Sequence, residues 1–376
     1  MRIDRREFLK KAGVAGIVLA GTACAPAVAP TPTAVPAPTK PASVVAGSPT
    51  AVPAVATPTA KPATVHFGSV KAASDAGVYI AIDRGYFAEQ GITLDLQAFA
   101  SGAAMLAPLS SGDLDIYGSS LATGILAAID RGIGIKVLAD KGTSGPGFEF
   151  AQIVIRKDLW DSGQVRGAKD LKGKKVGVTS LAGGSEAAFA YLLKPVGLSV
   201  KDLDLVSLSY PDMLVAFGNK GLDAADMTEP TLSSVVSNGL AVTWPGGTRS
   251  ATYGGVYQAG DIIASAQFDK NIDVARRFMV AYLKGVRDYN DAFVKGKGKS
   301  DIVNILIKYT ALKDPAQYDR MQMAGLNPDG KLATNTMTMD LDYFKQAGHY
   351  TGKLTINDIV DSQFADYAAQ QLGPYK

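Results

Sequence analysis

The sequence predicts an α/β protein with mostly parallel sheets. After Thr64, short runs rich in β-branched residues alternate with longer stretches of helical periodicity, which is the pattern of successive strand–helix units. The chain has 376 residues, of which 47% are hydrophobic and 19% charged. It is therefore long enough for a two-lobed globular body and too polar for a protein with several membrane spans.

The predicted strands are short and the predicted helices fill the gaps between them. The strands cover residues 65–68, 92–98, 114–118, 136–139, 151–156, 175–179, 203–208, 224–227 and 262–265. The helices cover residues 79–90, 103–110, 119–131, 185–195, 210–219, 228–238 and 271–294, and residues 300–375 are expected to be largely helical.

Residues 1–24 have the features of an export signal. A basic region precedes a short apolar run, residues 12–20, which is much shorter than the roughly 20 residues needed to span a bilayer. Residues 4–10, DRREFLK, resemble the twin-arginine export signal; the alternative is an ordinary secretory signal that contains an Arg pair. This region carries the whole formal net charge of +3. The remainder is near neutral, and it has no basic stripe that would indicate binding to nucleic acid.

Cys24 is the only cysteine of the chain and follows the apolar run directly. Residues 19–24, LAGTAC, resemble a bacterial lipobox, with Gly21 where Leu is usual, so we expect Cys24 to carry a lipid anchor; the alternative is an incidental thiol. Without a second cysteine there can be no intrachain disulfide. Residues 25–63 consist almost only of Pro, Ala, Thr, Val and Ser, which predicts a semi-rigid linker.

Five segments after the linker carry a family resemblance. They are residues 77–92 (GVYIAIDRGYFAEQGI), 109–115 (LSSGDLD), 127–133 (AAIDRGI), 171–178 (LKGKKVGV) and 226–230 (DMTEP). In this order they resemble the nitrate/sulfonate/taurine and thiamine-pyrimidine-precursor class of periplasmic-type binding proteins. The resemblance implies a type II periplasmic-binding-protein fold, in which two α/β lobes are joined by two crossover hinge strands.

The resemblance also implies an organisation and a set of partners. We expect the first lobe to comprise residues 64–150 and 260–376 and the second lobe residues 151–259, with crossovers near 150–155 and 257–263. A small-molecule ligand would be caught between the lobes of a monomer outside the cytoplasm and passed to the permease and ATPase of an ABC importer. No cofactor or metal is expected.

Candidate ligand-binding residues follow from topology, because ligands of open parallel sheets bind beyond the carboxyl ends of the strands. The polar and glycine candidates in those loops are Ser74, Asp75, Ser101, Ser119, Ser120, Ser180, Gly184, Ser185, Glu186, Asp226 and Glu229. Backbone N–H groups at helix starts can hold an anion or a polar oxygen. The alternative is that Ser119 and Ser185 only cap their own helices.

Aromatic side chains in or beside these loops and crossovers are the second group of candidates, because flat heterocycles are held well by stacking. The candidates are Tyr79, Phe148, Phe150, Tyr253 and Tyr257, with Tyr210 and Trp244 nearby. The alternative for each of them is packing in the core.

The acidic residues favour one class of ligand over another. Asp75, Glu186, Asp226 and Glu229 would repel a sulfonate or nitrate unless compensated, and Arg156 and Arg249 are the only nearby Arg residues. The first choice is therefore an aromatic or heterocyclic vitamin or precursor, such as riboflavin or a thiamine pyrimidine precursor. An alkylsulfonate, taurine or nitrate is the alternative.

A catalytic function has little support in the residues. A related eukaryotic branch makes the thiamine pyrimidine and carries a cysteine-rich motif, which this chain lacks. His66 and His349 are the only histidines, and neither lies in a metal-ligand spacing or beside a recognisable nucleophile. We therefore expect a binding protein rather than an enzyme. A surface adhesin would explain the anchor and linker but not the order of the five segments.

Overall fold

The computed structural model describes residues 61–310 and 312–376. The predicted signal peptide, the predicted lipidation site Cys24 and nearly all of the predicted linker lie outside the described residues. Of the linker, only residues 61–63 are described, and Ala63 already begins the first strand. Among the described residues, no helix has the length and apolar character needed to cross a membrane.

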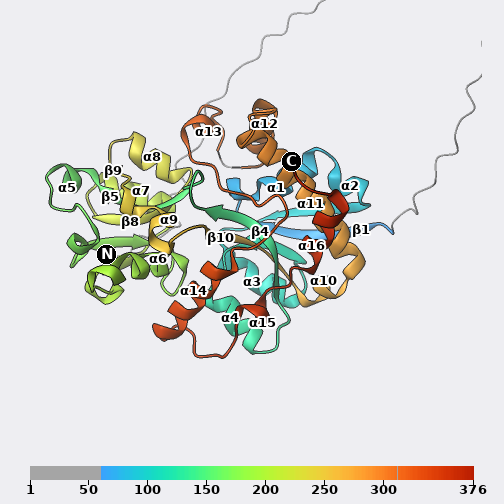
Figure 1. Cartoon of the computed structure of the whole chain (residues 1–376), viewed down its shortest axis with the longest axis horizontal. Helices are drawn as coiled ribbons and strands as arrows, with labels where there is room; N and C mark the ends of the chain where they lie inside the picture. Colours follow the sequence, from blue (N-terminus) through green and yellow to red (C-terminus); the bar gives the residue numbers. More distant parts are fainter. Residues whose placement is uncertain (1–60, 311) are drawn as a thin grey trace, which may run out of the picture. The chain divides into compact units, whose positions relative to one another are not determined.

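The chain forms two five-stranded sheets, each with its own helices, which we call the first and second lobes (Figure 1). The first sheet has the order β2-β1-β3-β10-β4 and the second the order β7-β6-β8-β5-β9. The strands of the first sheet are β1 (Ala63–Ser69), β2 (Ile92–Ala98), β3 (Ile116–Ser119), β4 (Lys136–Ser144) and β10 (Tyr257–Ala264). Those of the second sheet are β5 (Ala151–Arg156), β6 (Lys175–Val178), β7 (Asp204–Ser207), β8 (Ala224–Thr228) and β9 (Ala241–Val242).

The prediction of mostly parallel sheets is confirmed, since four strands of each sheet run in one direction and a single strand, β10 or β5, runs against them. Strands β1, β2 and β3 run parallel, but β10 is antiparallel to both β3 and β4. In the second sheet β6, β7 and β8 run parallel, while β5 is antiparallel to β8 and β9. The antiparallel strands are the ones that follow or precede the passages between the lobes, so they enter their sheet from the opposite end.

The chain passes between the lobes twice. Residues 145–150 lead from β4 to β5, and residues 254–256 lead from α9 to β10. Strands β4 and β10 are longer than predicted because they continue through Asp140–Ser144 and Tyr257–Asp261, whose polar residues and glycines do not read as strand. Tyr257 therefore belongs to the first sheet, three residues before the predicted boundary at 260.

Each sheet carries helices on both faces. The helices of the first lobe are η2 (Ala73–Asp75), α1 (Ala76–Asp83), α2 (Tyr86–Glu89), α3 (Gly102–Ser111), α4 (Thr123–Asp130), α10 (Ala266–Lys270), α11 (Ile272–Phe293), α12 (Lys299–Tyr309), α13 (Gln317–Arg320), α14 (Thr334–Gln346), α15 (Ile356–Ile359) and α16 (Gln363–Leu372). Those of the second lobe are α5 (Lys157–Asp161), η3 (Ala168–Leu171), α6 (Gly184–Leu193), η4 (Lys194–Val196), η5 (Val200–Asp202), α7 (Tyr210–Gly218), α8 (Thr231–Ser237), η6 (Pro245–Gly247) and α9 (Arg249–Tyr253).

The helices differ from the prediction in two places. The predicted helix 79–90 is two helices, α1 and α2, because Gly85 between them adopts a left-handed conformation with φ of 76°. The C-terminal stretch is helical in α12 to α16, but residues 321–333 contain no helix.

Alternating residues of each sheet fill separate cores on its two faces. Ile262 packs in the cluster with α1 and α11, whereas its neighbour Ile263 packs in the cluster that faces α3, α4 and α14. In the second sheet, Ile153 and Val154 divide in the same way between two clusters. Because successive side chains of a strand point to opposite faces, both sheets are buried on both sides.

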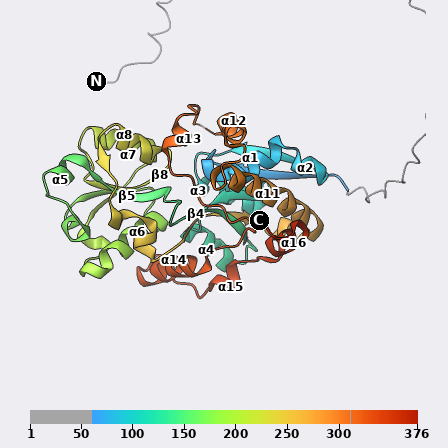
Figure 2. The ribbon, with the colours of Figure 1, turned by 45° about the horizontal axis from the view of Figure 1, so that its top comes forward.

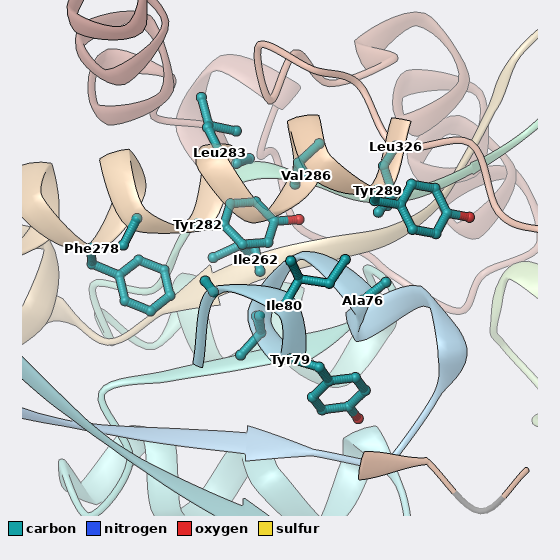
Figure 3. Packing of buried hydrophobic residues seen from close by; sticks show 14 of the residues in the cluster. Ala76, Tyr79, Ile80, Ile262, Phe278, Tyr282, Leu283, Val286, Tyr289 and Leu326 are labelled. Atoms are coloured by element: carbon teal, nitrogen blue, oxygen red, sulfur yellow. The ribbon is translucent and has the colours of Figure 1, made fainter. Parts of the chain in front are cut away.

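The largest core of the first lobe lies where α1 meets α11 (Figure 3). The helices approach so closely that a Cβ atom on Gly285 would lie 2.1 Å from the carbonyl oxygen of Gly77. Helix α11 also binds strand β4 and the loop after α13, both of which reach the cavity between the lobes. Tyr282 Oη donates to the carbonyl of Asp140 at 2.7 Å, and Tyr289 Oη donates to that of Ala324 at 2.6 Å.

Candidate functional site

A cavity of about 240 Å³ lies between the two lobes. The first lobe contributes the loops after β1 and β3, the middle of β4, the start of β10 and residues 321–324. The second lobe contributes the loops after β6 and β8, together with Phe150, Tyr210 and Arg249. Four of these loops follow the carboxyl ends of the parallel strands β1, β3, β6 and β8, which is the position expected of a ligand site in α/β sheets.

The structure brings ten of the sixteen predicted site residues into the wall of this cavity. They are Ser74, Ser119, Ser120, Phe150, Ser180, Gly184, Ser185, Asp226, Glu229 and Tyr257.

The two serines with an alternative capping role do not cap helices. Helix α4 begins at Thr123, four residues after Ser119, and Ser185 lies inside α6 behind the N-cap Gly183. Ser185 Oγ instead accepts a hydrogen bond from the backbone N–H of Thr179 at 3.0 Å. Ser185 thus shapes the loop after β6 that lines the cavity.

The other six predicted residues lie outside the lining. Ser101 is an exposed N-cap of α3, where its Oγ accepts from the N–H of Ala104. Phe148 lies in the passage between β4 and β5, two residues before the lining residue Phe150. Asp75, Tyr79, Glu186 and Tyr253 are buried and do not line the cavity.

Lys141 and Asp75 form a buried ion pair in the first lobe. Lys141 Nζ lies 2.7 Å from Asp75 Oδ1 and donates to Ser74 Oγ at 3.0 Å. The other carboxylate oxygen of Asp75 accepts from Ser69 Oγ at 2.6 Å and from Tyr79 Oη at 3.2 Å. Asp75 is therefore a fixed partner of the cavity residue Lys141, and Tyr79 binds Asp75 from the other side.

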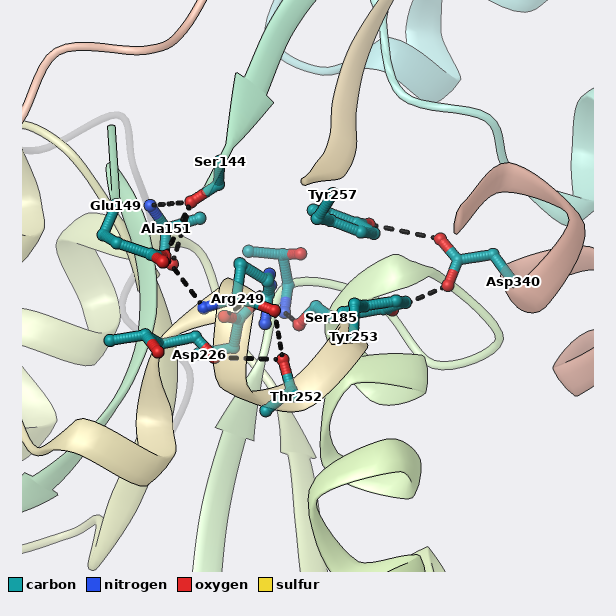
Figure 4. A network of polar contacts seen from close by, with 12 residues as sticks. Ser144, Glu149, Ala151, Ser185, Asp226, Arg249, Thr252, Tyr253, Tyr257 and Asp340 are labelled. Carbon is teal, nitrogen blue, oxygen red and sulfur yellow. Dashed lines mark hydrogen bonds and ion pairs between the residues drawn. The ribbon is translucent and has the colours of Figure 1, made fainter. Parts of the chain in front are cut away.

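Arg249 and Asp226 form the corresponding pair in the second lobe (Figure 4). Arg249 Nη2 donates to both carboxylate oxygens of Asp226, at 2.7 and 2.8 Å, and the guanidinium lies 5.0 Å from the centre of the Tyr257 ring. Burial opposes the charge of Arg249, but the Asp226 carboxylate outweighs it and raises the pKa of Arg249. Arg249 therefore keeps its positive charge, while burial raises the pKa of its partner Asp226.

The remaining nitrogens of Arg249 are available for another partner. Its side chain is 3% exposed, yet Nε and Nη1 have no hydrogen-bond partner within the described structure. Leaving buried polar groups unpaired is costly, and Arg has five N–H donors. A hydrogen-bond acceptor brought into the cavity could therefore satisfy these donors.

Two of the four acidic residues are compensated by a buried cation and the other two are held by hydrogen bonds, so the repulsion of an anion is weaker than the sequence suggests. Asp75 pairs with Lys141, and Asp226 pairs with Arg249. Glu229 accepts from the N–H and Oγ of Ser233, at 2.9 and 2.8 Å, and from the N–H of Gln322 at 3.1 Å. Glu186 accepts hydrogen bonds from Ala182, Tyr343 and His349.

Sequence reasoning did not include several lining residues among the candidates. Lys141 stands in a strand whose predicted end was Ala139, so its position gave no signal. Arg249 was noted only as a nearby cation, and the other cation noted, Arg156, binds Asp158 and Asp223 instead of lining the cavity. Met321, Gln322 and Ala324 reach the cavity from a loop without any motif.

Comparisons with known proteins agree with this architecture. A family model described as NMT1/THI5 like matches residues 73–291, more than half of the chain. No match is found among curated proteins. The periplasmic aliphatic sulphonate binding protein SsuA from Escherichia coli is 17% identical, with a TM-score of 0.63 over 80% of this chain and 92% of SsuA.

Two further solved structures share the fold. The periplasmic nitrate-binding protein NrtA from Synechocystis PCC 6803 is 15% identical, with a TM-score of 0.64 over 83% of this chain and 89% of NrtA. The desulfurization enzyme DSZB is 13% identical, with a TM-score of 0.57 over 82% of this chain and all of that chain. The predicted two-lobed α/β fold and the predicted family are confirmed. The chain belongs to the NMT1/THI5-like family.

Proposed function

We propose that this chain is the solute-binding component of an ABC importer and that it binds one small organic molecule in the cavity between its lobes. The observation that carries the proposal is the cavity wall itself. It combines hydroxyl groups from the strand ends of both lobes with the unpaired N–H groups of the buried Arg249. A molecule that contacts both lobes stabilises their closed arrangement, which is how a binding protein retains its ligand.

The proposed ligand is a flat aromatic or heterocyclic molecule that carries hydrogen-bond acceptors. Phe150, Tyr210 and Tyr257 supply aromatic surface, and Phe150 and Tyr210 are only partly buried. Arg249 and Tyr253 already lie against the Tyr257 ring, so Phe150 and Tyr210 are the rings left for stacking. Riboflavin and a thiamine pyrimidine precursor are molecules of this kind.

An alkylsulfonate or a similar anion is the second candidate. The ion pairs of Asp75 and Asp226 reduce the repulsion that argues against an anion, and Lys141 and Arg249 both line the cavity. SsuA and NrtA, which share the fold, are named for binding a sulphonate and nitrate.

The proposal extends to location and partners. The basic and apolar N-terminus, Cys24 and the Pro-rich linker support an extracytoplasmic protein held to a membrane by a lipid at Cys24. The partners are the permease and ATPase of the importer, and the chain acts as a monomer.

An enzyme on the same fold is the alternative of another class, because DSZB is a desulfurization enzyme. A binding experiment separates the two. The protein is heated with riboflavin, an aminopyrimidine alcohol, taurine, MOPS or nitrate, and the compound is recovered and analysed by mass spectrometry. A binder gains stability as RT ln(1 + [L]/Kd) and returns the compound unchanged. A consumed compound would contradict the binding role.

A further inference from the structure

Helix α14, from the C-terminal segment that follows the first sheet, packs against α6 of the second lobe as well as against β10 (Figure 2). Three tyrosines of the second lobe and β10 donate to it. Tyr191 Oη donates to the carbonyl of Met339 at 2.5 Å. Tyr253 and Tyr257 donate to the two carboxylate oxygens of Asp340, at 2.6 and 3.2 Å (Figure 4). The lobes are thus connected by this segment in addition to the two crossovers.

Glu186 of α6 is the point where the C-terminal segment meets the cavity loop of the second lobe. Its Oε1 accepts hydrogen bonds from Tyr343 Oη and, at 2.7 Å, from His349 Nε2. Its Oε2 accepts from the backbone N–H of Ala182 at 3.0 Å. An ionised carboxylate can only accept hydrogen bonds. One oxygen of Glu186 accepts from the C-terminal segment and the other from the cavity loop, so the carboxylate connects the two.

Ala182 is a backbone position that needs external support. It has a φ of 58°, in the left-handed region that residues other than glycine seldom adopt. Glu186 holds its N–H, and Thr123 of the first lobe donates to its carbonyl at 3.3 Å. The same loop supplies Thr179, Ser180 and Gly183 to the cavity wall.

We infer that Glu186, His349 and Tyr343 form an interlobe clasp that holds the two lobes together without any solute, with Glu186 as the positioning residue for the cavity loop. The carboxylate binds the C-terminal segment through one oxygen and the strained Ala182 through the other. Loss of the C-terminal partner leaves the segment bound to the second lobe only through Tyr191 and Tyr253, which weakens the connection. It also removes the anchor that positions the Glu186 carboxylate under Ala182. The effect of the clasp on solute affinity rests on the proposed function, but its effect on the lobes does not.

The test measures the distance between the lobes in the absence of solute. Spin labels are placed on the full chain carrying Cys24→Ser, at Ala107→Cys on α3 and at Lys172→Cys in the second lobe, both exposed residues. Double electron–electron resonance then gives the distance distribution. We expect one dominant distance in this parent and a shift of most of the population to longer distances in His349→Ala and Glu186→Gln.

His66→Ala is the matched control. His66 Nδ1 also lies beside a carboxylate, at 3.0 Å from Asp95, but both residues belong to the first lobe. Its distance distribution should equal that of the parent. If Glu186→Gln does not fold, the distance distribution of His349→Ala is the test of the clasp. This variant should fold, because the His349 side chain is 29% exposed and its removal leaves no large cavity.

Identical distributions in the parent and His349→Ala would overturn the clasp. The distance measurement is made without solute. It therefore tests the clasp even if the proposed function is wrong. Where one of the five tested compounds binds, loss of the clasp should raise its dissociation rate about tenfold. The ratio of affinities for two bound compounds should stay the same, since the cavity wall keeps its side chains; a changed ratio would assign Glu186 to the ligand instead.

Discussion

The ammonium of Lys141 lies 2.7 Å from the carboxylate of Asp75, and both side chains are almost fully removed from solvent beneath the cavity. Removing one member of such a pair leaves an uncompensated buried charge, which typically costs about 3–5 kcal/mol. We predict that Lys141→Met lowers the free energy of unfolding by about 3 kcal/mol in urea denaturation. The double variant Asp75→Asn, Lys141→Met should recover much of this loss. A loss of about 0.5 kcal/mol or less, as for an exposed pair, would contradict the account.

Arg249 is predicted to contribute to affinity through its unpaired nitrogens. Arg249→Lys keeps a positive charge beside Asp226 but removes the donors Nε and Nη1. Affinity for the compound that binds best should fall about 10–100-fold, since a hydrogen bond to a charged group contributes about 1.5–3 kcal/mol. Isothermal titration calorimetry measures this directly. Arg166→Lys is the control, because Arg166 contacts Trp160 away from the cavity and its replacement should leave affinity unchanged.

Close packing of α1 on α11 predicts a strong effect at Gly285. A methyl group there would lie 2.1 Å from the backbone oxygen of Gly77, so Gly285→Ala must separate the helices. We predict a loss of about 1–3 kcal/mol of stability, the usual cost of overpacking. Gly218→Ala, at the end of α7, meets no atom within 4 Å and should be neutral or slightly stabilising. Equal midpoints of denaturation for the two variants would refute the packing argument.

The raised pKa of the buried Asp261 carboxyl leads us to predict that stability depends on pH. Burial, together with nearby Asp140, raises the pKa of Asp261 to about 8. Between the ordinary Asp pKa near 4 and this value, the folded state holds a proton that the unfolded state has released. The contribution of Asp261 is therefore fully present at low pH and is lost as pH rises towards 8, by about 1.4 kcal/mol per unit.

Asp261→Asn isolates this contribution, because the amide resembles the protonated acid and its oxygen can still accept from the N–H of Leu121. The stability of the variant relative to the wild type should rise steadily between pH 5 and pH 8 in parallel urea titrations. A constant difference across this range would show that Asp261 does not titrate there.

The sequence was informative where short-range patterns decide structure. β-Branched runs located nine of the ten strands approximately, all but β9, and the rule that ligands bind at strand ends placed Ser74, Ser119 and Ser185 in one cavity. Long-range packing decided the rest. Nothing local shows that β10 begins at Tyr257, because its pairing with β4 is made across more than 100 residues.

Charged residues were the least predictable from sequence. Asp75, Asp226 and Glu186 were expected to face a ligand, but each is neutralised or bound by a residue distant in the chain. A paired carboxylate repels an anion far less than a free one. An acidic residue near a site therefore argues against an anionic ligand only if it has no cationic partner. The partners Lys141 and His349 lie in stretches whose local pattern suggested no role in binding.

The most direct test of a solute site between the lobes compares two adjacent residues. Ser180 lines the cavity, whereas its exposed neighbour Leu181 does not. Native mass spectrometry of the wild type, purified without denaturation and supplied with the compound of largest thermal shift, should show one molecule bound per chain. Ser180→Trp should lose it and Leu181→Trp should keep it. Equal binding by Ser180→Trp and the wild type, or no bound compound in any of the three proteins, would contradict a solute site in this cavity.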